Sequence, residues 1–303
     1  MDTNQKKKFA AGLSIISNVV LTILKIVAGA ISGNLSIISE AIHSLSDFFA
    51  SMITFISVVK SSKPADKDHP YGHGKYEDMA GFIEGLLIIL AAIFIVYKSC
   101  EKIATGLPTE YENSLGIAVM IIAVITNYII STILFRIAKS TNSIALHADG
   151  EHLRTDVFSS VGVLLGLYLI KITGHTILDP VIAILVAGFI YKTGYKISKK
   201  AWMNLLDHSL PKTDIENINN IIKNFSHCAK LKHNGIKARQ VGPTKDIDLI
   251  LQFPEQTPIC ECHKICDAIE KQILALYTNS SISIHSEPLC YKKDCQNSCK
   301  NHC

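Results

Sequence analysis

The sequence predicts an α-helical membrane protein with six transmembrane helices, followed by a C-terminal cytosolic α+β domain. The chain has 303 residues, of which 48% are hydrophobic and only 18% are charged, and its mean hydropathy is +0.27. An average soluble protein carries roughly 25% charged residues, so the deficit indicates contact with lipid. Long apolar runs occur up to about residue 200, whereas the remainder has the composition of a soluble domain.

Six apolar segments are long enough to cross a bilayer, because a spanning helix needs about 20 predominantly apolar residues. They are 9–31, 37–59, 79–103, 114–137, 144–170 and 177–197.

Basic residues gather at one side of these spans and predict their orientation. They lie before the first span, between the second and third, between the fourth and fifth, and after the sixth. By the positive-inside rule, both termini are cytoplasmic. The residues concerned are Lys6, Lys7, Lys8, Lys60, Lys63, Lys67, Lys75, Arg136, Lys139, Lys199 and Lys200.

The C-terminal part reads as a small domain of alternating helices and strands. We expect helices at 211–225 and 258–277, and strands at 236–241, 247–253 and 282–285. The order α-β-β-α-β is that of a ferredoxin-like, metallochaperone-like domain with helices on a three-stranded sheet. The predicted division is 1–204 for the membrane domain, 205–289 for the soluble domain, and 290–303 for a cysteine-rich tail. The net charge of +4 is scattered and predicts no nucleic-acid partner.

Two predicted spans carry the same pair of polar residues at the same spacing. His43 and Asp47 are four residues apart in the second span, and His152 and Asp156 repeat the pair in the fifth. Ionisable residues inside a membrane usually mark a functional pathway. Two imidazoles and two carboxylates suit zinc and its neighbours. The alternative is that each pair satisfies itself within its own helix.

Other polar residues occur in or near the spans. Residues nearer the span ends are expected to be solvated or to cap a helix: Glu40, Asp149 and Glu151. Three others are candidates for a polar pathway or for interhelical hydrogen bonds: Asn18, Glu84 and Asn127.

Three motifs resemble the cation diffusion facilitator family. They are the run from Ser36 to Asp47, the loop Asp68-His-Pro-Tyr-Gly-His-Gly-Lys75, and His152-Leu-Arg-Thr-Asp156 with the serines that follow. The resemblance implies a homodimer in a lipid membrane that exports cytosolic divalent metal in exchange for protons by alternating access. It also implies that the four intramembrane residues hold the transported ion, in a bacterial or archaeal plasma membrane. Such a protein is a secondary active transporter, not an enzyme, and needs no catalytic cofactor.

His43 bears on the identity of the transported metal. Many bacterial family members have Asp at this position, whereas the His–Asp/His–Asp set resembles the more zinc-selective members. A second imidazole favours zinc, cobalt or nickel over manganese. We therefore expect zinc as the first cargo, with iron(II), cobalt, nickel, cadmium and manganese as the other candidates.

The loop between the second and third spans matches a peripheral zinc site of some family members through Asp66, His69 and His73. A solvated loop with capping residues is the alternative. Lys75 and Asp207 match a charge pair between the membrane and soluble domains in the family.

The soluble domain contains further candidate metal ligands. By resemblance, His233, His263, His285 and Glu287 match positions that bind regulatory metal across the dimer, although Ile250 replaces one family ligand. Cys260, Cys262 and Cys266 surround His263 and could extend the set, or could be buried core residues. In a cytosolic domain, clustered cysteines more often bind metal than form disulfides. The tail offers five more: Cys290, Cys295, Cys299, His302 and Cys303.

Two other functional classes remain for comparison. A membrane-anchored metal sensor would use the soluble domain as its active part, but an anchor has no need of intramembrane ligands. An intramembrane metalloprotease would require an H-E-x-x-H helix, and the sequence contains none. The transporter hypothesis therefore accounts best for the polar residues inside the spans.

Overall fold

The computed structural model describes residues 2–32, 35–105, 114–173 and 177–289. Within these ranges it leaves out the side chains of 29, 31–32, 35–43, 114–116, 163–164, 166–167, 170–171 and 179. The chain divides into two compact units, Met1–Leu205 and Leu206–Cys303.

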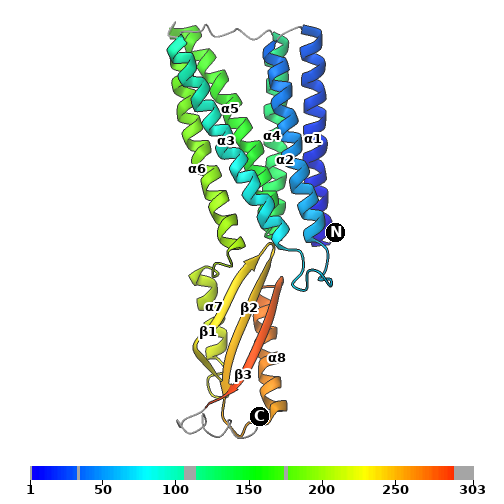
Figure 1. The fold of residues 1–303 in the computed structure, drawn as a ribbon, viewed down its shortest axis with the longest axis vertical. Helices are drawn as coiled ribbons and strands as arrows, with labels where there is room; N and C mark the ends of the chain where they lie inside the picture. Colours follow the sequence, from blue (N-terminus) through cyan, green and yellow to red (C-terminus); the bar gives the residue numbers. More distant parts are fainter. Residues whose placement is uncertain (1, 33–34, 106–113, 174–176, 290–303) are drawn as a thin grey trace. The chain divides into compact units, whose positions relative to one another are not determined.

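The first unit consists of six long helices that follow the predicted spans closely (Figure 1). They are α1 (Thr3–Ser32), α2 (Leu35–Ser61), α3 (Lys75–Thr105), α4 (Ser114–Thr141), α5 (Ile144–Thr173) and α6 (Leu178–Leu205). Each extends beyond the apolar segment from which it was predicted, because a helix continues into the polar residues that flank a membrane.

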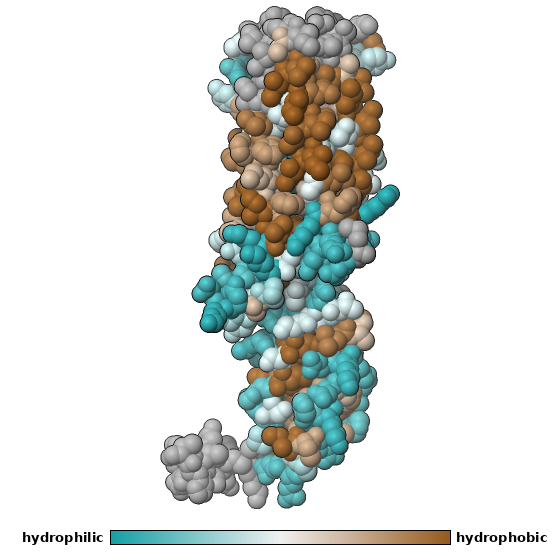
Figure 2. All heavy atoms as spheres, turned by 90° about the vertical axis from the view of Figure 1, so that its right-hand side faces the viewer, coloured by the Kyte–Doolittle hydropathy of each residue, from teal (hydrophilic) through white to brown (hydrophobic). Residues whose placement is uncertain are grey.

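The face of the helical unit that Figure 2 shows is predominantly apolar, as its brown colour indicates. Large side chains such as Ile16, Leu90 and Leu185 are more than half exposed. Four of the described segments are long and apolar enough to cross a membrane: Thr3–Ala28, Lys75–Thr105, Ile117–Thr141 and Pro180–Leu205. The predicted fold class is confirmed, and the chain is an integral membrane protein.

Small residues allow α3 and α6 to approach closely, and the two helices lie side by side in Figure 1. A Cβ atom added to Gly85 would lie only 2.7 Å from the backbone nitrogen of Ser198. A Cβ atom on Gly194 would lie 3.0 Å from the carbonyl oxygen of Gly85. Such contacts are typical of membrane helices, whose association depends on close packing of small residues.

A buried carboxylate joins several helices near the start of α3. Glu77 accepts a hydrogen bond from Lys7 Nζ of α1 at 2.6 Å and from Ser61 Oγ of α2 at 2.6 Å. Its other oxygen accepts a hydrogen bond from Ser143, which immediately precedes α5. Lys7 and Glu77 are both almost fully buried, so removing either one would leave an uncompensated charge.

The second unit has two helices packed against a three-stranded sheet, in the predicted order. Its elements are α7 (Lys212–Lys223), β1 (Lys230–Val241), β2 (Thr244–Phe253), α8 (Ile259–Leu276) and β3 (Ser280–Pro288). The sheet order is β1-β2-β3, with β1 antiparallel and β3 parallel to β2. Ile218 of α7, Leu249 of β2 and Ile269 of α8 lie in one hydrophobic core, which holds both helices against the sheet.

Strand β1 begins earlier than the sequence predicted. Its pairing with β2 shifts register between Leu231 and Ile236. Asn234 has a φ of 57° there, and a Cβ on Gly235 would lie 2.9 Å from the carbonyl oxygen of Ile250. This bulge interrupts the alternation of apolar and polar residues along β1. The sequence therefore predicts only the second half of the strand.

We predict that Gly85→Ala destabilises the helical unit. The added methyl group must displace the backbone of α6 at Ser198, and overpacking of this kind lowers stability by about 1–3 kcal/mol. The measurement is the thermal unfolding temperature of the purified protein in detergent. Gly188→Ala on α6 is the matched control, because a Cβ at Gly188 would have no atom within 4 Å. Equal unfolding temperatures for the two variants would contradict the prediction.

Candidate functional site

The ligand groups of two helices meet inside the six-helix unit. Asp47 lies on α2, and His152 and Asp156 lie one turn apart on α5. One ligand atom from each of these three residues lies within 4.8 Å of the other two. His43 is one turn before Asp47 on α2, and its side chain is outside the described residues. The structure therefore brings together the three predicted ligands whose side chains it describes.

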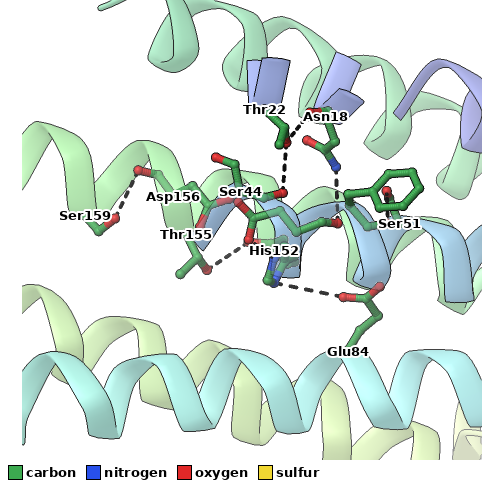
Figure 3. Close-up of polar contacts among 12 residues, drawn as sticks. Asn18, Thr22, Ser44, Ser51, Glu84, His152, Thr155, Asp156 and Ser159 are labelled. Carbon is green, nitrogen blue, oxygen red and sulfur yellow. Dashed lines mark hydrogen bonds and ion pairs between the residues drawn. The ribbon is translucent and has the colours of Figure 1, made fainter. Parts of the chain in front are cut away.

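Two of these three side chains are buried. Asp47 and His152 are each 7% exposed, and Asp156 is of intermediate exposure. His152 Nε2 lies 3.2 Å from Asp47 Oδ1, a contact that joins α5 to α2. Figure 3 shows His152 and Asp156 near Ser44 of α2. The contact of His152 with Asp47 joins the two predicted His–Asp pairs across two helices, whereas the contact between His43 and Asp47 lies outside the described side chains.

Helix α1 supports the turn of α2 that carries Asp47. The Asn18 amide donates to the backbone carbonyl of Asp47 at 3.4 Å, and Thr22 Oγ1 donates to that of Ser44 at 3.1 Å (Figure 3). Lys25 Nζ donates to Ser44 Oγ at 2.7 Å. These contacts fix α2 through its backbone, so the carboxylate of Asp47 stays directed toward α5.

Two further acidic residues are fully buried near the ligands. Glu84 of α3 accepts a hydrogen bond from Thr54 Oγ1 at 3.1 Å, and its Oε2 lies 4.0 Å from His152 Nδ1. Asp149 of α5 is 0% exposed, so its predicted solvated position is wrong. Asp149, His152 and Asp156 follow the i, i+3, i+7 spacing and therefore share one face of α5. This spacing is the sequence signal that Asp149 faces inward with the other two.

The loop between α2 and α3 brings its three predicted ligands together. Ligand atoms of Asp66, His69 and His73 lie within 4.8 Å of one another. His73 Nε2 is 3.3 Å from Asp66 Oδ2, and His69 Nδ1 is 3.4 Å from Asp66 Oδ1. The backbone N–H of His69 donates to Asp66 and, with the two nearby histidines, lowers the pKa of this carboxyl group. The loop is therefore arranged to present an ionised carboxylate beside two imidazoles.

The candidate ligands of the soluble domain are spread over several surfaces. On β3, His285 Nε2 lies 3.8 Å from Glu287 Oε1, and Lys232 donates to the same oxygen at 2.9 Å. This lysine lowers the pKa of Glu287. His233 lies in the irregular part of β1. Among the described residues, the groups of three potential ligands are those of α2 with α5 and of the loop.

Helix α8 places two of its three cysteines in the core and leaves its third cysteine and its histidine exposed. Cys262 and Cys266 are buried in the hydrophobic core, and Cys266 Sγ lies 3.6 Å from Ser286 Oγ. Cys260 is exposed, and the His263 side chain is 76% exposed and lies 3.6 Å from Asp267. The core position of Cys262 and Cys266 matches the alternative in which they are packing residues.

Two further groups of residues remain predictions. Lys75 and Asp207 belong to separate units, so their charge pair stays a prediction. Within the soluble unit, Asp207 Oδ2 lies 3.1 Å from Arg239 Nη1, and Arg239 also contacts Asp246 at 2.8 Å. The tail residues lie outside the described part of the chain: Cys290, Cys295, Cys299, His302 and Cys303.

We predict that Cys260 is alkylated much faster than Cys266 in the native protein. Burial raises the pKa of the Cys266 thiol, so at pH 8 this residue has less of the reactive thiolate as well as less access to reagent. Peptide mass spectrometry after timed iodoacetamide treatment measures both rates, and denatured protein is the control in which they converge. Equal rates in the native protein would contradict the packing position of Cys266.

Comparison with known proteins covers both units. Residues 12–206 match the cation efflux transmembrane domain, and residues 210–289 match the cytoplasmic domain of cation efflux proteins.

Similar proteins match nearly the whole chain. An uncharacterized transporter of Synechocystis sp. is 34% identical over 88% of this chain and 85% of its own length. An uncharacterized transporter of Methanocaldococcus jannaschii is 33% identical over 90% and 95%. The cation-efflux pump FieF of Yersinia enterocolitica is 29% identical over 93% and 92%. By these matches, which cover both the helical unit and the second unit, the chain belongs to the cation diffusion facilitator family and is a cation efflux transporter.

Proposed function

We propose that the protein exports divalent transition-metal ions from the cytosol in exchange for protons, with His43, Asp47, His152 and Asp156 as the transport site. The observation that carries this proposal is the group of Asp47, His152 and Asp156, whose ligand atoms converge from two helices. Packing in an apolar bundle does not require carboxylates and an imidazole to converge on one point. A bound metal ion does require several ligand atoms close together.

Proton exchange follows from the chemistry of the same ligands. An imidazole and a carboxylate must each be deprotonated to bind metal, and each can take up a proton when the metal leaves. The ligands come from α2 and α5, which contact each other much less extensively than α3 and α6 do. Relative movement of α2 and α5 would therefore expose the site to one side of the membrane and then to the other, which is alternating access.

Zinc is the proposed first cargo. A site with two imidazoles and two carboxylates matches the ligand preference of zinc and of borderline metals better than that of manganese. The similar FieF proteins are named cation-efflux pumps, which agrees with a cation as substrate. Iron(II), cobalt, nickel and cadmium are the other candidates, and manganese is the least favoured.

The proposed assembly is a homodimer with both termini in the cytoplasm. The match of residues 210–289 to a cytoplasmic domain supports this orientation, as do the basic loops. We propose the domain division 1–204, 205–289 and 290–303, which agrees with the two matched regions. Metal bound by the loop or the soluble domain would then regulate transport by favouring one conformation of the dimer.

We predict that Asp47→Ala and Asp156→Ala each abolish metal transport, because each removes a charged ligand of the ion. Transport is measured as zinc uptake into inside-out proteoliposomes with an outward-directed proton gradient. Glu101→Ala on α3 is the control, because Glu101 pairs with Lys98 at 2.9 Å, away from the ligands. Zinc uptake at the native rate in either Asp variant would refute the transport site.

We also predict that His43→Asp raises manganese uptake relative to zinc uptake. The substitution replaces a borderline nitrogen ligand with a harder oxygen ligand and keeps the number of ligands. Initial uptake rates of the two metals in the same proteoliposomes give the ratio for the native chain and the variant. An unchanged ratio would mean that His43 does not contribute to the choice of metal.

A further inference from the structure

Two buried polar atoms face each other across the boundary between α3 and α5. His152 Nδ1 and Glu84 Oε2 lie 4.0 Å apart, and Figure 3 shows the Glu84 carboxylate directed toward the imidazole ring. A distance of 4.0 Å is too long for a hydrogen bond, and neither atom has another hydrogen-bond partner among the described residues. Buried polar atoms are usually hydrogen-bonded, because an unsatisfied one lowers stability. This pair is therefore one short movement away from satisfying both groups.

The His152 ring lies between carboxylates from two different helices. Its Nε2 is 3.2 Å from Asp47 of α2, and its Nδ1 faces Glu84 of α3. A neutral imidazole that binds a metal through Nε2 carries its proton on Nδ1, and that N–H requires an acceptor. Glu84 is placed to be this acceptor. Thr54 donates to its Oε1, and its Oε2 faces His152 Nδ1.

We propose that Glu84 is a positioning residue of the transport site: its carboxylate accepts a hydrogen bond from His152 Nδ1 and thereby presents His152 Nε2 to the metal. The inference rests on the proposed function, in which His152 is a ligand. Metal-binding histidines usually donate their second ring N–H to a carboxylate, a carbonyl or water, and the partner fixes both the proton and the ring orientation.

The neighbouring residue fixes the position of Glu84. Gly85 packs directly against the backbone of Ser198 on α6, so the backbone of α3 cannot recede at this point. The Nδ1–Oε2 distance must shorten by roughly 1 Å to reach hydrogen-bond length. Small changes in the side-chain torsion angles of Glu84 and His152 can supply a movement of this size.

Glu84 is not placed to be an additional ligand of the same ion. The converging ligand atoms belong to Asp47, His152 and Asp156, whereas Glu84 faces the opposite nitrogen of the imidazole ring. A ligand role would require Glu84 to reach around the ring. A positioning residue can be replaced by an uncharged hydrogen-bond acceptor with little loss of zinc affinity, whereas a charged metal ligand cannot.

The experiment compares Glu84→Gln, which retains an acceptor oxygen without the charge, with Glu84→Leu, which removes it. Zinc binding to the full-length protein in detergent is measured by titration calorimetry. Binding at the transport site is defined as the component that Asp47→Ala lacks. We expect Glu84→Leu to weaken this component by about 10- to 100-fold and Glu84→Gln to remain within about threefold of native. Glu101→Gln on the same helix is the control and should bind zinc as the native protein does.

Two further measurements separate positioning from folding. Cobalt(II) replaces zinc as a spectroscopic probe, and its visible absorption should change in Glu84→Leu and return to the native shape in Glu84→Gln. Thr54→Val removes the donor to Glu84 Oε1 without touching His152, and it should weaken zinc binding by about 2- to 10-fold. If Glu84→Leu does not fold, as judged by gel filtration, Thr54→Val and Glu84→Gln still decide the question.

Several outcomes would overturn the inference. Native zinc affinity in Glu84→Leu would show that His152 needs no partner. Equal loss in Glu84→Gln and Glu84→Leu would assign Glu84 a charge or ligand role instead. Native affinity in Thr54→Val, where Glu84→Leu does not fold, would also refute it. These results leave the transport site intact as long as Asp47→Ala removes binding, whereas a full binding component in Asp47→Ala would refute the proposed function itself.

Discussion

The contact between Asp47 and His152 is the constraint on which the rest of the membrane unit depends. It places a carboxylate of α2 beside an imidazole of α5 at 3.2 Å, in a bundle whose outer surface is apolar. Charged groups in such surroundings require partners from the protein itself. Asp47 and His152 provide such partners for each other, and α3 brings Glu84 to within 4.0 Å of the other side of the imidazole. Helix α1 donates hydrogen bonds to the backbone carbonyls of Ser44 and Asp47. The polar contacts of the site therefore determine how α1, α2, α3 and α5 pack around it.

The sequence predicted the six helices and the order of the soluble elements, because long apolar runs and local periodicity carry that information. It also predicted Asp47, His152 and Asp156 as one site, since the His–Asp spacing is repeated in two spans. It did not predict the partner of Glu84. That contact joins residues of α3 and α5, and a single acidic residue in a span gives no sign of which helix it faces.

Burial accounts for the other differences between expectation and structure. Lys7 reads in the sequence as one of three lysines before the first span, yet it is buried against Glu77, 70 residues further along the chain. Asp149 reads as a residue near a span end, yet it is fully buried. In the soluble unit, the bulge of β1 conceals half of the strand, and the hydrophobic face of α8 takes up Cys262 and Cys266. In each case a contact distant in sequence determines the environment.

The glycine contact between α3 and α6 also limits how the protein can change shape. At Gly85 and Gly194 the two backbones approach closely, and Ile88 and Ile89 of α3 also pack against Gly194 of α6. Further along, Phe82 of α3 contacts Trp202 of α6. We therefore expect these two helices to move as one body, and the sliding surfaces of a transport cycle to lie where this pair meets the remaining four helices.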